Sequence, residues 1–392
     1  MIDQIKAAAD RIYERLVAVR RHLHAHPELS FQEHQTSDYV ENALKELGLE
    51  VTRMATTGLV VMIEGGKPGP VIALRGDMDA LPILEKNDVP YCSTNEGVMH
   101  ACGHDVHTTC LLGAAMILNE LKDGLSGSVK LIFQPGEEKL PGGASIMIKE
   151  GALENPRPVS IFGQHVHPEL EVGKVGFKAG KYMASCDEVY LTVKGKGGHG
   201  ALPHKNIDPI LIAAETIVAM QQVVSRHSDP MMPTVLSFGR IEGKGATNVI
   251  PDTVEIAGTF RTFDEDWRQE AHKWIGQIAE ETAKAHGGTC EVRIERGYPF
   301  VHNDEALTER ARTAAEAYLG AENVVDLEMR ATGEDFSYYS QVMPGSFHRL
   351  GVRNEAKGII HPVHSPHFDV DEACLRLGAG LMAWLAVNEM KG

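Results

Sequence analysis

The spacing of hydrophobic residues predicts two helices at the start of the chain. Over residues 3–23, apolar side chains recur at intervals typical of one face of an amphipathic helix. These side chains are Ile5, Ile12, Leu16, Val19 and Leu23. A second helix is expected over residues 36–47, because Gly48 follows it and glycine commonly ends helices.

Short apolar runs after these helices predict strands that alternate with further helices. The expected elements are, in order, strands at 58–64 and 71–75, a helix at 106–122, a strand at 129–133, a helix at 143–150 and a strand at 159–164. Asp105 is placed as the N-cap of the helix at 106–122. The strand at 71–75 is nearly all apolar, as in a strand buried on both faces. This alternation indicates an α/β domain with a mostly parallel central sheet.

A different order of elements begins near residue 187 and predicts a second domain. It contains strands at 189–194, 234–241, 253–261 and 289–296, and helices at about 208–226 and 266–286. Their β-α-β-β-α-β order is the split, ferredoxin-like arrangement. The first pattern then returns, with a helix at 304–319, a strand near 323–328, loops, and a final helix at 372–390. We therefore expect a catalytic domain of residues 1–186 and 297–392, into which a domain of residues 187–296 is inserted.

Composition and charge narrow the class of protein. The chain has 392 residues, which favours two domains over one core, and a formal net charge of −16. That charge argues against nucleic acid and acidic membrane surfaces as partners. The N-terminus lacks the pattern of a signal peptide, and no run of about eighteen apolar residues occurs, so a cytoplasmic protein is expected. The six cysteines lack framework spacing, so an unusual cysteine suggests a metal or catalytic role.

The densest group of potential metal ligands lies in His-Ala-Cys-Gly-His-Asp-Val-His at residues 100–107. A helix is expected to begin there, and a helix N-terminus stabilises a thiolate such as that of Cys102. One glycine separates Cys102 from His104, so both side chains can turn toward one point. The alternative is a buried cysteine among surface histidines, which so dense a cluster makes the less favoured interpretation.

Carboxylates and imidazoles also follow other expected strands. They are Asp77, Asp79, Glu137, Glu138, His165 and His167, joined by His361, His364 and His367 in a C-terminal loop. The carboxyl ends of parallel strands form the ligand crevice of α/β sheets, so these side chains can meet at one site. One of the adjacent Glu137 and Glu138 can bind a metal while the other serves as a general base. Thiolate, imidazole and carboxylate together suit zinc, and also manganese, nickel or cobalt. Taken singly, each segment is equally consistent with solvated loops and capping residues.

Several stretches of the chain together resemble a known family. They are RRHLHAHPELSFQE, RGDMDALP, MHACGHDVHT, FQPGEE, GKGGHGALPH, TNVIPD, GTFRT and HSPHFD, in that order. They resemble the co-catalytic metallopeptidase family of aminoacylases and glutamate carboxypeptidases. Within it they are most similar to the amidohydrolase subfamily of hippurate hydrolases, N-acyl-amino-acid amidohydrolases and auxin-conjugate hydrolases. The resemblance implies a di-metal catalytic domain with an inserted lid and dimerisation domain.

The resemblance also implies roles for individual residues. The implied ligands of two divalent metal ions per subunit are Cys102, His104, Glu138, His165 and His364, with Cys102 as the bridge. The resemblance implies that Glu137 is the general base and that Asp79 is a carboxylate that orients a metal ligand. In the inserted domain, the resemblance implies that His199 binds the oxyanion in a neighbouring subunit's site. It also implies that Asn248 and Arg261 bind the carboxylate of the substrate. A homodimer, or a tetramer, is therefore expected.

Some alternatives stay open on the residues alone. His167 could replace His165 as a ligand, and His361 or His367 could replace His364. The segments around His199 and Asn248 could be a Gly-rich hairpin and a turn, and Arg261 could pair with Asp264 or Glu265. The wider family has a ligand histidine at the position of Asp77 and a bridging aspartate at that of Cys102.

The sequence thus predicts an enzyme that hydrolyses the amide bond of an N-acyl amino acid or a short peptide. Water activated by the metals would attack the carbonyl, with Glu137 as general base. A dipeptidase or carboxypeptidase of the same family is the nearest alternative. A thiol hydrolase, with Cys102 as nucleophile and His104 or His100 as base, is another class. A binding protein without catalysis is a third, and Glu137 and His199 argue against it.

Overall fold

The computed structural model describes residues 1–391, which form two compact units. The first comprises Met1–Lys181, His302–Met329 and the segment that begins at Asp335. The second comprises Tyr182–Val301 and Arg330–Glu334. Residues 187–296, which the sequence indicates as the inserted domain, all belong to the second unit.

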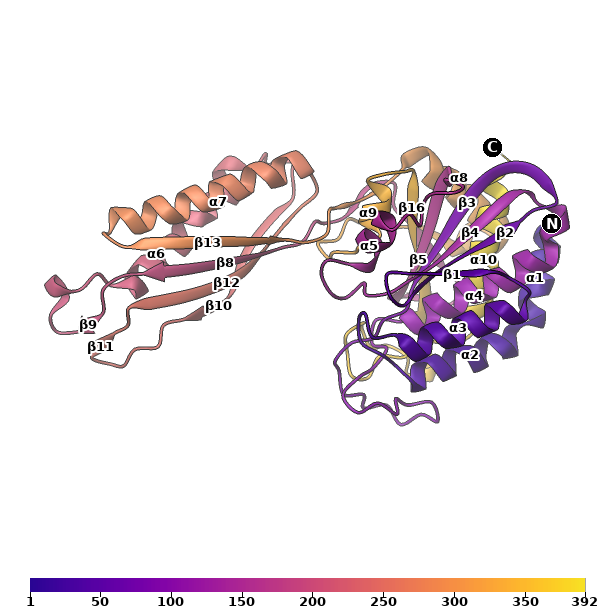
Figure 1. Cartoon of the computed structure of the whole chain (residues 1–392), viewed down its shortest axis with the longest axis horizontal. Coiled ribbons are helices and arrows are strands. Elements are labelled where there is room, and N and C mark those ends of the chain that lie inside the picture. Colours follow the sequence, from indigo (N-terminus) through magenta and orange to yellow (C-terminus); the bar gives the residue numbers. More distant parts are fainter. Residues whose placement is uncertain (392) are drawn as a thin grey trace. The chain divides into compact units, whose positions relative to one another are not determined.

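The first unit is built on a sheet that, within the described residues, has eight strands in the order β1-β2-β4-β3-β5-β16-β6-β15. Figure 1 labels β1 to β5 and β16 in this sheet. The strands are β1 (Val51–Met54), β2 (Gly58–Glu64), β3 (Lys67–Asp77), β4 (Ser126–Gln134), β5 (Ser160–Glu171), β6 (Val175–Phe177), β15 (Val324–Asp326) and β16 (Gly345–Arg353). The four central strands, β4, β3, β5 and β16, are parallel to their neighbours in this group, whereas β1, β2 and β6 join antiparallel at its two sides. The predicted α/β fold with a mostly parallel central sheet is confirmed.

The register of the central strands brings polar residues to one edge of the sheet. Asp77, the last residue of β3, pairs with Gln134, the last residue of β4. On the other side of β3, Arg75 pairs with Gly163 of β5. His165 therefore lies two residues beyond that pair, close to the ends of β3 and β4. Before these positions the strands are largely buried, with apolar runs at residues 71–74 of β3 and 131–133 of β4, as in strands covered on both faces.

Helices cover the sheet of the first unit. They are α1 (Ile2–Arg11), α2 (Tyr13–Ala25), α3 (His34–Glu46), α4 (His104–Leu121), α5 (Gly143–Lys149), α8 (Glu305–Leu319), α9 (Ser337–Ser340) and α10 (Cys374–Glu389). α4 and α10 pack against each other and against β3. α4 is buried along nearly its whole length, so it carries apolar residues on every side. The helix predicted over residues 3–23 is two helices, which meet at Ile12.

Two predictions for this unit are wrong. Asp105 is not an N-cap, because α4 begins at His104 after Gly103, and the carboxylate of Asp105 instead binds the buried side chains of Arg20 and His24. Residues 345–353 were expected to be loop but form β16, in the interior of the sheet order. Its polar His348 and Arg349 are buried, and they interrupt the apolar run that would otherwise indicate a central strand.

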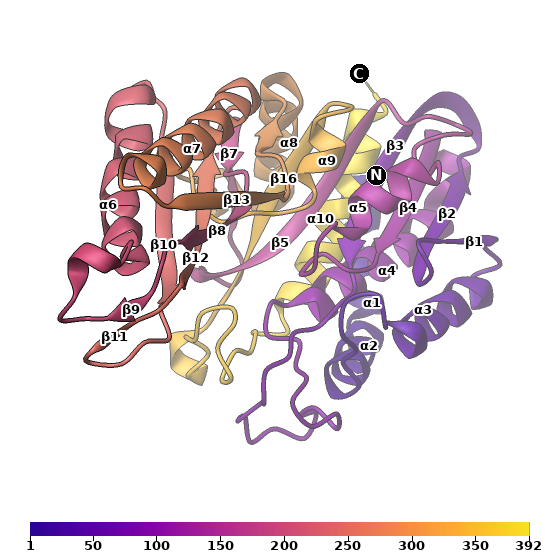
Figure 2. The same cartoon turned by 60° about the vertical axis from the view of Figure 1, so that its left-hand side comes forward.

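The second unit is a four-stranded antiparallel sheet, among the described residues, in the order β10-β12-β8-β13 (Figure 2). Its elements are β8 (Asp187–Lys194), α6 (Pro209–Gln222), β10 (Thr234–Glu242), β12 (Thr253–Thr262), α7 (Glu265–Ala285) and β13 (Thr289–Arg296). α6 and α7 pack against each other and against the sheet, and the apolar core lies between them and the strands. This is the βαββαβ arrangement that the sequence predicts. In the part of the chain that the structure describes, each helix is too short or too polar to traverse a lipid bilayer.

Candidate metal centre and active site

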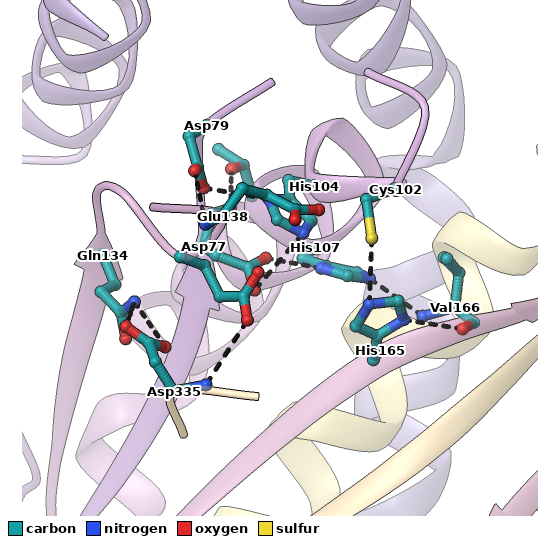
Figure 3. Close-up of polar contacts among 12 residues, drawn as sticks. Asp77, Asp79, Cys102, His104, His107, Gln134, Glu138, His165, Val166 and Asp335 are labelled. Atoms are coloured by element: carbon teal, nitrogen blue, oxygen red, sulfur yellow. Dashed lines mark hydrogen bonds and ion pairs between the residues drawn. The ribbon is translucent and has the colours of Figure 1, made fainter. Parts of the chain in front are cut away.

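A left-handed glycine places Cys102 and His104 on the same side of the start of α4. Gly103, between them, has φ +83°, and a Cβ atom there would lie 2.6 Å from Cγ2 of Val166. Only glycine fits this turn without strain. Cys102 Sγ lies 3.4 Å from Nε2 of His165, in the middle of β5 (Figure 3). Together, one donor atom from each of Cys102, His104 and His165 lies within 4.8 Å of the others.

The hydrogen bonds of the two histidines leave one nitrogen of each available to a metal ion. His165 donates from Nδ1 to the carbonyl oxygen of Val166, at 2.8 Å, so its Nε2 faces Cys102 as an acceptor. His104 donates from Nδ1 to Asp79 Oδ1, at 3.1 Å. The Nε2 atom of His104 is buried and has no hydrogen-bond partner. A metal-binding histidine typically donates from one ring nitrogen to a carboxylate and leaves the other nitrogen without a hydrogen-bond partner, and His104 has this arrangement.

Glu138 and His364 form a second group that shares Cys102. His364 Nε2 lies 3.3 Å from Glu138 Oε1, and both atoms lie within 4.8 Å of Cys102 Sγ. The backbone of His364 has φ +64°, a conformation unusual for histidine, and its N–H donates to the carbonyl of Ala101 at 2.7 Å. The structure therefore brings together all five residues that the resemblance implies as ligands, with Cys102 common to both groups.

The acid–base properties of this cluster favour a bound cation. Burial, helped by the charge of Glu138, raises the pKa of the Cys102 thiol. Hydrogen bonds with Cys102 and Glu138 raise the pKa of His364 to about 10. Burial, with Arg349 nearby, holds the pKa of His165 well below its ordinary value, so His165 is neutral. The cluster thus attracts positive charge, and a divalent cation can displace the protons of Cys102 and His364. The residues present fit a metal site.

The raised pKa of Cys102 also argues against a thiol hydrolase. A nucleophilic cysteine normally has a lowered pKa and a basic neighbour that takes its proton. Burial lowers the pKa of His100, one candidate base, to about 4.

Asp77 and His107 tie α4 to the sheet and do not offer free ligand atoms. His107 donates from Nδ1 to Asp77 Oδ1, at 2.6 Å, and its Nε2 accepts from the backbone N–H of Val166, at 2.9 Å. Both nitrogens of His107 are therefore occupied, although Asp77, His104 and His107 lie close enough to suggest a third metal group. Asp77 also accepts from Nη1 of Arg75, at 2.7 Å. The carboxylate of Asp77 therefore positions the segment next to His165.

The turn that carries Glu137 and Glu138 is held by carboxylates from other segments. The N–H of Glu138 donates to Asp79 Oδ2, at 3.0 Å, and that of Gly136 donates to Glu33 Oε1, at 2.8 Å. Glu137 Oε1 lies 3.4 Å from the backbone nitrogen of Asp335, which donates to it. Asp79 therefore touches both a candidate ligand histidine and the catalytic turn.

Sequence reasoning missed three side chains around this turn. Glu33 and Ser30 precede α3, and Asp335 follows the second unit in the chain. Ser30 donates to Asp79, at 2.7 Å, and Asp335 accepts from Arg75 and Gln134, at 2.6 and 2.8 Å. These contacts join distant segments, so no local spacing indicates them. Only the presence of Ser30 and Glu33 in the first matching motif could have drawn attention to them.

The remaining histidines in the two ligand segments have other contacts. His167 pairs with Glu169, at 3.0 Å, and lies two residues beyond His165 on β5. The rings of His361 and His367 lie 5.3 Å apart and are exposed. None of the three belongs to the groups of potential ligands found in the described part of the chain.

In the second unit, the structure brings His199 and Asn248 together. The short strands β9 (Gly198–His199) and β11 (Val249–Ile250) pair, with His199 opposite Val249, and Gly200 N–H donates to the carbonyl of Asn248 at 2.8 Å. Both residues are exposed. Arg261 lies near the other end of β12, roughly 26 Å along the strand from Thr253 at 3.3 Å per residue. Arg261 and Asn248 of one chain therefore do not lie side by side.

The two residues that could have paired with Arg261 have other roles. Asp264 accepts from the N–H groups of Asp266 and Trp267 and caps α7. Glu265 pairs with Arg268, at 2.9 Å. Arg261 itself donates from Nε to the hydroxyl of Thr259, at 2.9 Å.

This fold and this group of donors define a metal-binding hydrolase. The chain belongs to the peptidase family M20/M25/M40, whose sequence model matches residues 73–388. It is 42% identical over 363 residues to the N-acetyl-L-cysteine deacetylase of Bacillus subtilis (strain 168), covering 92% of this chain and 85% of that one. It is 40% identical over 392 residues to thermostable carboxypeptidase 2 of Saccharolobus solfataricus (strain ATCC 35092 / DSM 1617 / JCM 11322 / P2), covering 99% and 98%.

Among solved structures, the chain is similar to a dinuclear metal-binding peptidase of the M20 family from Bacillus subtilis. The TM-score is 0.84 and the identity 37%, over 97% of this chain and 99% of that one. The family resemblance predicted from the motifs is confirmed, and the protein is a hydrolase of amide bonds with groups of potential metal ligands.

Proposed function

We propose that the protein hydrolyses the amide bond of N-acyl amino acids. The observation that carries this proposal is the convergence of five donor side chains, in two groups that share Cys102, next to the carboxylate of Glu137. The similarity to a deacetylase of an N-acyl amino acid supports this substrate class. Release of the amino acid from short peptides is the second candidate, because the carboxypeptidase relative matches almost the whole chain.

We propose that each subunit binds two divalent ions. Zinc is the preferred ion, and manganese, nickel or cobalt are the alternatives. The ligands would be Cys102, His104 and His165 in the first group, and Cys102, Glu138 and His364 in the second. One thiolate among imidazoles and a carboxylate favours the softer ions of this series. When bound, such ions acidify water and polarise a carbonyl oxygen.

The side chains of the protein would then transfer a proton from water to the leaving nitrogen and stabilise the negative charge that develops on the carbonyl oxygen. Glu137 would accept a proton from the attacking water and return it to the leaving nitrogen. Asp79 would hold the tautomer of His104 through the hydrogen bond to Nδ1. His199 would donate to the oxyanion that develops on the carbonyl, and Asn248 and Arg261 would bind the substrate carboxylate.

We propose that the protein works as a homodimer formed through the second unit. Strand β10 lies at the edge of its sheet, where its outer hydrogen-bonding groups can pair with another strand. Apolar side chains are exposed on this strand and on α6: Val235, Ile241, Ile210, Leu211 and Val218. An apolar surface beside an open sheet edge is typical of a subunit interface. Because Asn248 and Arg261 lie far apart in one chain, a substrate would meet them only if they came from different subunits.

We further propose a cytoplasmic location. All six cysteines are free thiols, and a reducing compartment keeps free thiols from oxidation.

The first experiment compares metal-free and metal-loaded protein. Protein stripped with a chelator is reconstituted with zinc, manganese, cobalt or nickel and assayed with N-acetyl, N-benzoyl and N-succinyl amino acids beside dipeptides. Metal-dependent release of free amino acid from N-acyl substrates is the expected result. The matched variant Glu137→Gln should bind the same amount of metal and lose roughly 10²–10⁴-fold in kcat.

Two outcomes would contradict the proposal. Turnover that ignores chelation but ends on alkylation of thiols would make Cys102 a nucleophile. Normal turnover by Glu137→Gln would remove the general base from the scheme. A preference for dipeptides over all N-acyl amino acids would favour the second candidate.

A further inference from the structure

The segment Glu28–Glu33 lies beside the end of β3 and is anchored through Glu28 and Leu29. Leu29 forms a parallel bridge with Ala80, whose N–H donates to the carbonyl of Glu28 at 2.8 Å. The carboxylate of Glu28 accepts from the N–H groups of Gln35 and Thr36 in the first turn of α3, at 3.1 and 2.8 Å. The segment is therefore anchored to the active-site end of the sheet and to the start of α3.

The side chain of Glu33 reaches from this segment to the residue before Glu137. It is completely buried, at 0% exposure. Its Oε1 accepts from the N–H groups of Gly136 and Phe31, at 2.8 and 2.9 Å, and its Oε2 accepts from the hydroxyl of Thr57, at 2.7 Å. Burying a carboxylate costs free energy unless hydrogen bonds compensate for the lost water. Because three donors bind the carboxylate of Glu33, its position is well fixed.

The other side of Glu137 is held in the same way. The N–H of Glu138 donates to Asp79 Oδ2 (Figure 3). The same oxygen accepts from the hydroxyl of Ser30. The two peptide N–H groups that flank Glu137 therefore each bind a buried carboxylate. Ser30 and Glu33 are three residues apart in one segment, so the same segment supports both carboxylate contacts.

A close apolar contact further restricts the turn. Gly136 has φ +59°, and a Cβ atom there would lie 2.4 Å from Cζ of Phe31. Phe31 itself has φ +64°, which is unusual for an aromatic residue. The ring of Phe31 thus covers the one position in the turn that has no side chain, and Glu33 binds the N–H of that same residue.

We propose that Glu33 is a positioning residue for amide hydrolysis, which fixes the backbone on the N-terminal side of Glu137 and so sets where the Glu137 carboxylate lies. The inference rests on the proposed function, in which Glu137 transfers the proton. Proton transfer requires hydrogen-bond distance, and a displacement of about 1 Å can cost roughly 100-fold in rate. Glu33 binds Gly136, Phe31 and Thr57, none of which is a candidate metal ligand. Its effect should therefore appear in kcat and leave metal binding unchanged.

The test is a double-mutant cycle with Glu137. Glu33→Met keeps the length of the side chain and removes the acceptor. Glu33→Gln keeps an oxygen that can accept from Gly136, and its amide can donate to Thr57. Thr57→Val removes the third donor to Glu33 and leaves the bond to Gly136. Each is made alone, and Glu33→Met is also combined with Glu137→Gln. Metal content, KM, kcat and thermal unfolding are measured on metal-loaded protein.

We expect Glu33→Met to lower kcat by roughly tenfold or more, with KM and two bound metals per subunit retained. In the Glu137→Gln background the same change should lower the residual kcat by roughly twofold or less, because the group it positions is already absent. Glu33→Gln should restore most of the activity, and Thr57→Val should leave kcat near that of the parent. If Glu33→Met does not fold, Glu33→Ala replaces it in the same cycle, since water can then reach the two freed N–H groups.

The proposal is overturned by an equal loss of kcat in both backgrounds, which would indicate a merely structural role. It is also overturned by unchanged kcat in Glu33→Met, or by loss of metal from that variant. Failure of the proposed function is recognised separately, because it would appear as normal turnover in the single variant Glu137→Gln.

Discussion

Cys102 is the residue on which the two ligand groups depend. It belongs to both, and its thiol gives the site a softer donor than a carboxylate would. The placement of this thiol depends on Gly103, whose left-handed turn directs Cys102 and His104 to the same side.

Replacing this thiol with a carboxylate should change which metal the site prefers. We expect Cys102→Asp to retain two metal ions per subunit and to lose affinity for zinc relative to manganese, because carboxylate is a harder ligand than thiolate. Competition titrations with a chromophoric chelator measure both affinities. Cys102→Ala is the matched control and should bind fewer ions of either kind. An unchanged zinc preference in Cys102→Asp would mean that the thiol is not a ligand.

Some residues of the candidate site could be predicted from the sequence, whereas others are identified only by the structure. The ligand segments carry rare residue types in dense clusters, so their residues could be predicted from chemistry and from a family resemblance. Glu33 and Asp335 could not, because a carboxylate that binds a distant N–H leaves no trace in local spacing. His107 was visible as a possible ligand, yet the structure gives both of its nitrogens to hydrogen bonds.

At the scale of elements, the sequence predicts those whose two faces differ. The amphipathic helices of the N-terminus and the alternating strands of the second unit have one polar and one apolar side, and periodicity finds them. β16 has buried polar residues although both of its faces are covered, so the hydrophobic pattern does not predict a strand there. The break between α1 and α2 also escapes, because Ile12 continues the apolar face across it.

The long connection between β3 and α4 depends on Glu85 for its conformation. Glu85 accepts from the ring of His24, the backbone N–H of Ser93 and the amide of Asn87, at 3.1, 2.7 and 3.0 Å. Burial opposes ionisation, but the contacts with His24 and these donors lower the pKa of Glu85 to about 2. A folded-state pKa below the unfolded value means that the carboxylate stabilises the fold above about pH 4.5, and that this stabilisation is lost as the pH falls toward 2.

Glu85→Gln should therefore reduce stability more at pH 7 than at pH 3. Urea unfolding of metal-free protein at both pH values measures the difference from the parent protein. Glu96→Gln, an exposed carboxylate in the same connection, is the control and should show a small difference at both. A deficit for Glu85→Gln that is the same at pH 3 and pH 7 would show that the charge of Glu85 does not contribute.

At the scale of the whole molecule, the proposed active site requires two chains. His199 and Asn248 lie together at β9 and β11, away from Arg261 along β12. If His199 serves the site of a partner, two variants that are inactive alone should complement each other.

A mixture of His199→Ala and Glu137→Gln homodimers, exchanged through mild denaturant, tests this arrangement. Random reassembly makes half of the dimers mixed, and each mixed dimer has one intact site of two, so about one quarter of the parent activity is expected. Glu137→Gln mixed with Glu137→Gln,His199→Ala is the control and should remain inactive. Absence of recovery from a mixture shown to contain mixed dimers would place His199 in its own subunit's site.

The insertion of the second unit has a consequence for the order in which a newly made chain can fold. The strands and helices of that unit are continuous in the sequence, between Tyr182 and Val301, so they can pair as soon as they leave the ribosome. The first unit cannot close so early, because β16 enters the interior of its sheet from residues 345–353 and buried Arg20 binds Asp369. During synthesis, the five donor side chains of the centre must wait for His364. A nascent chain stalled before this residue would therefore carry a folded second unit and an incomplete metal centre.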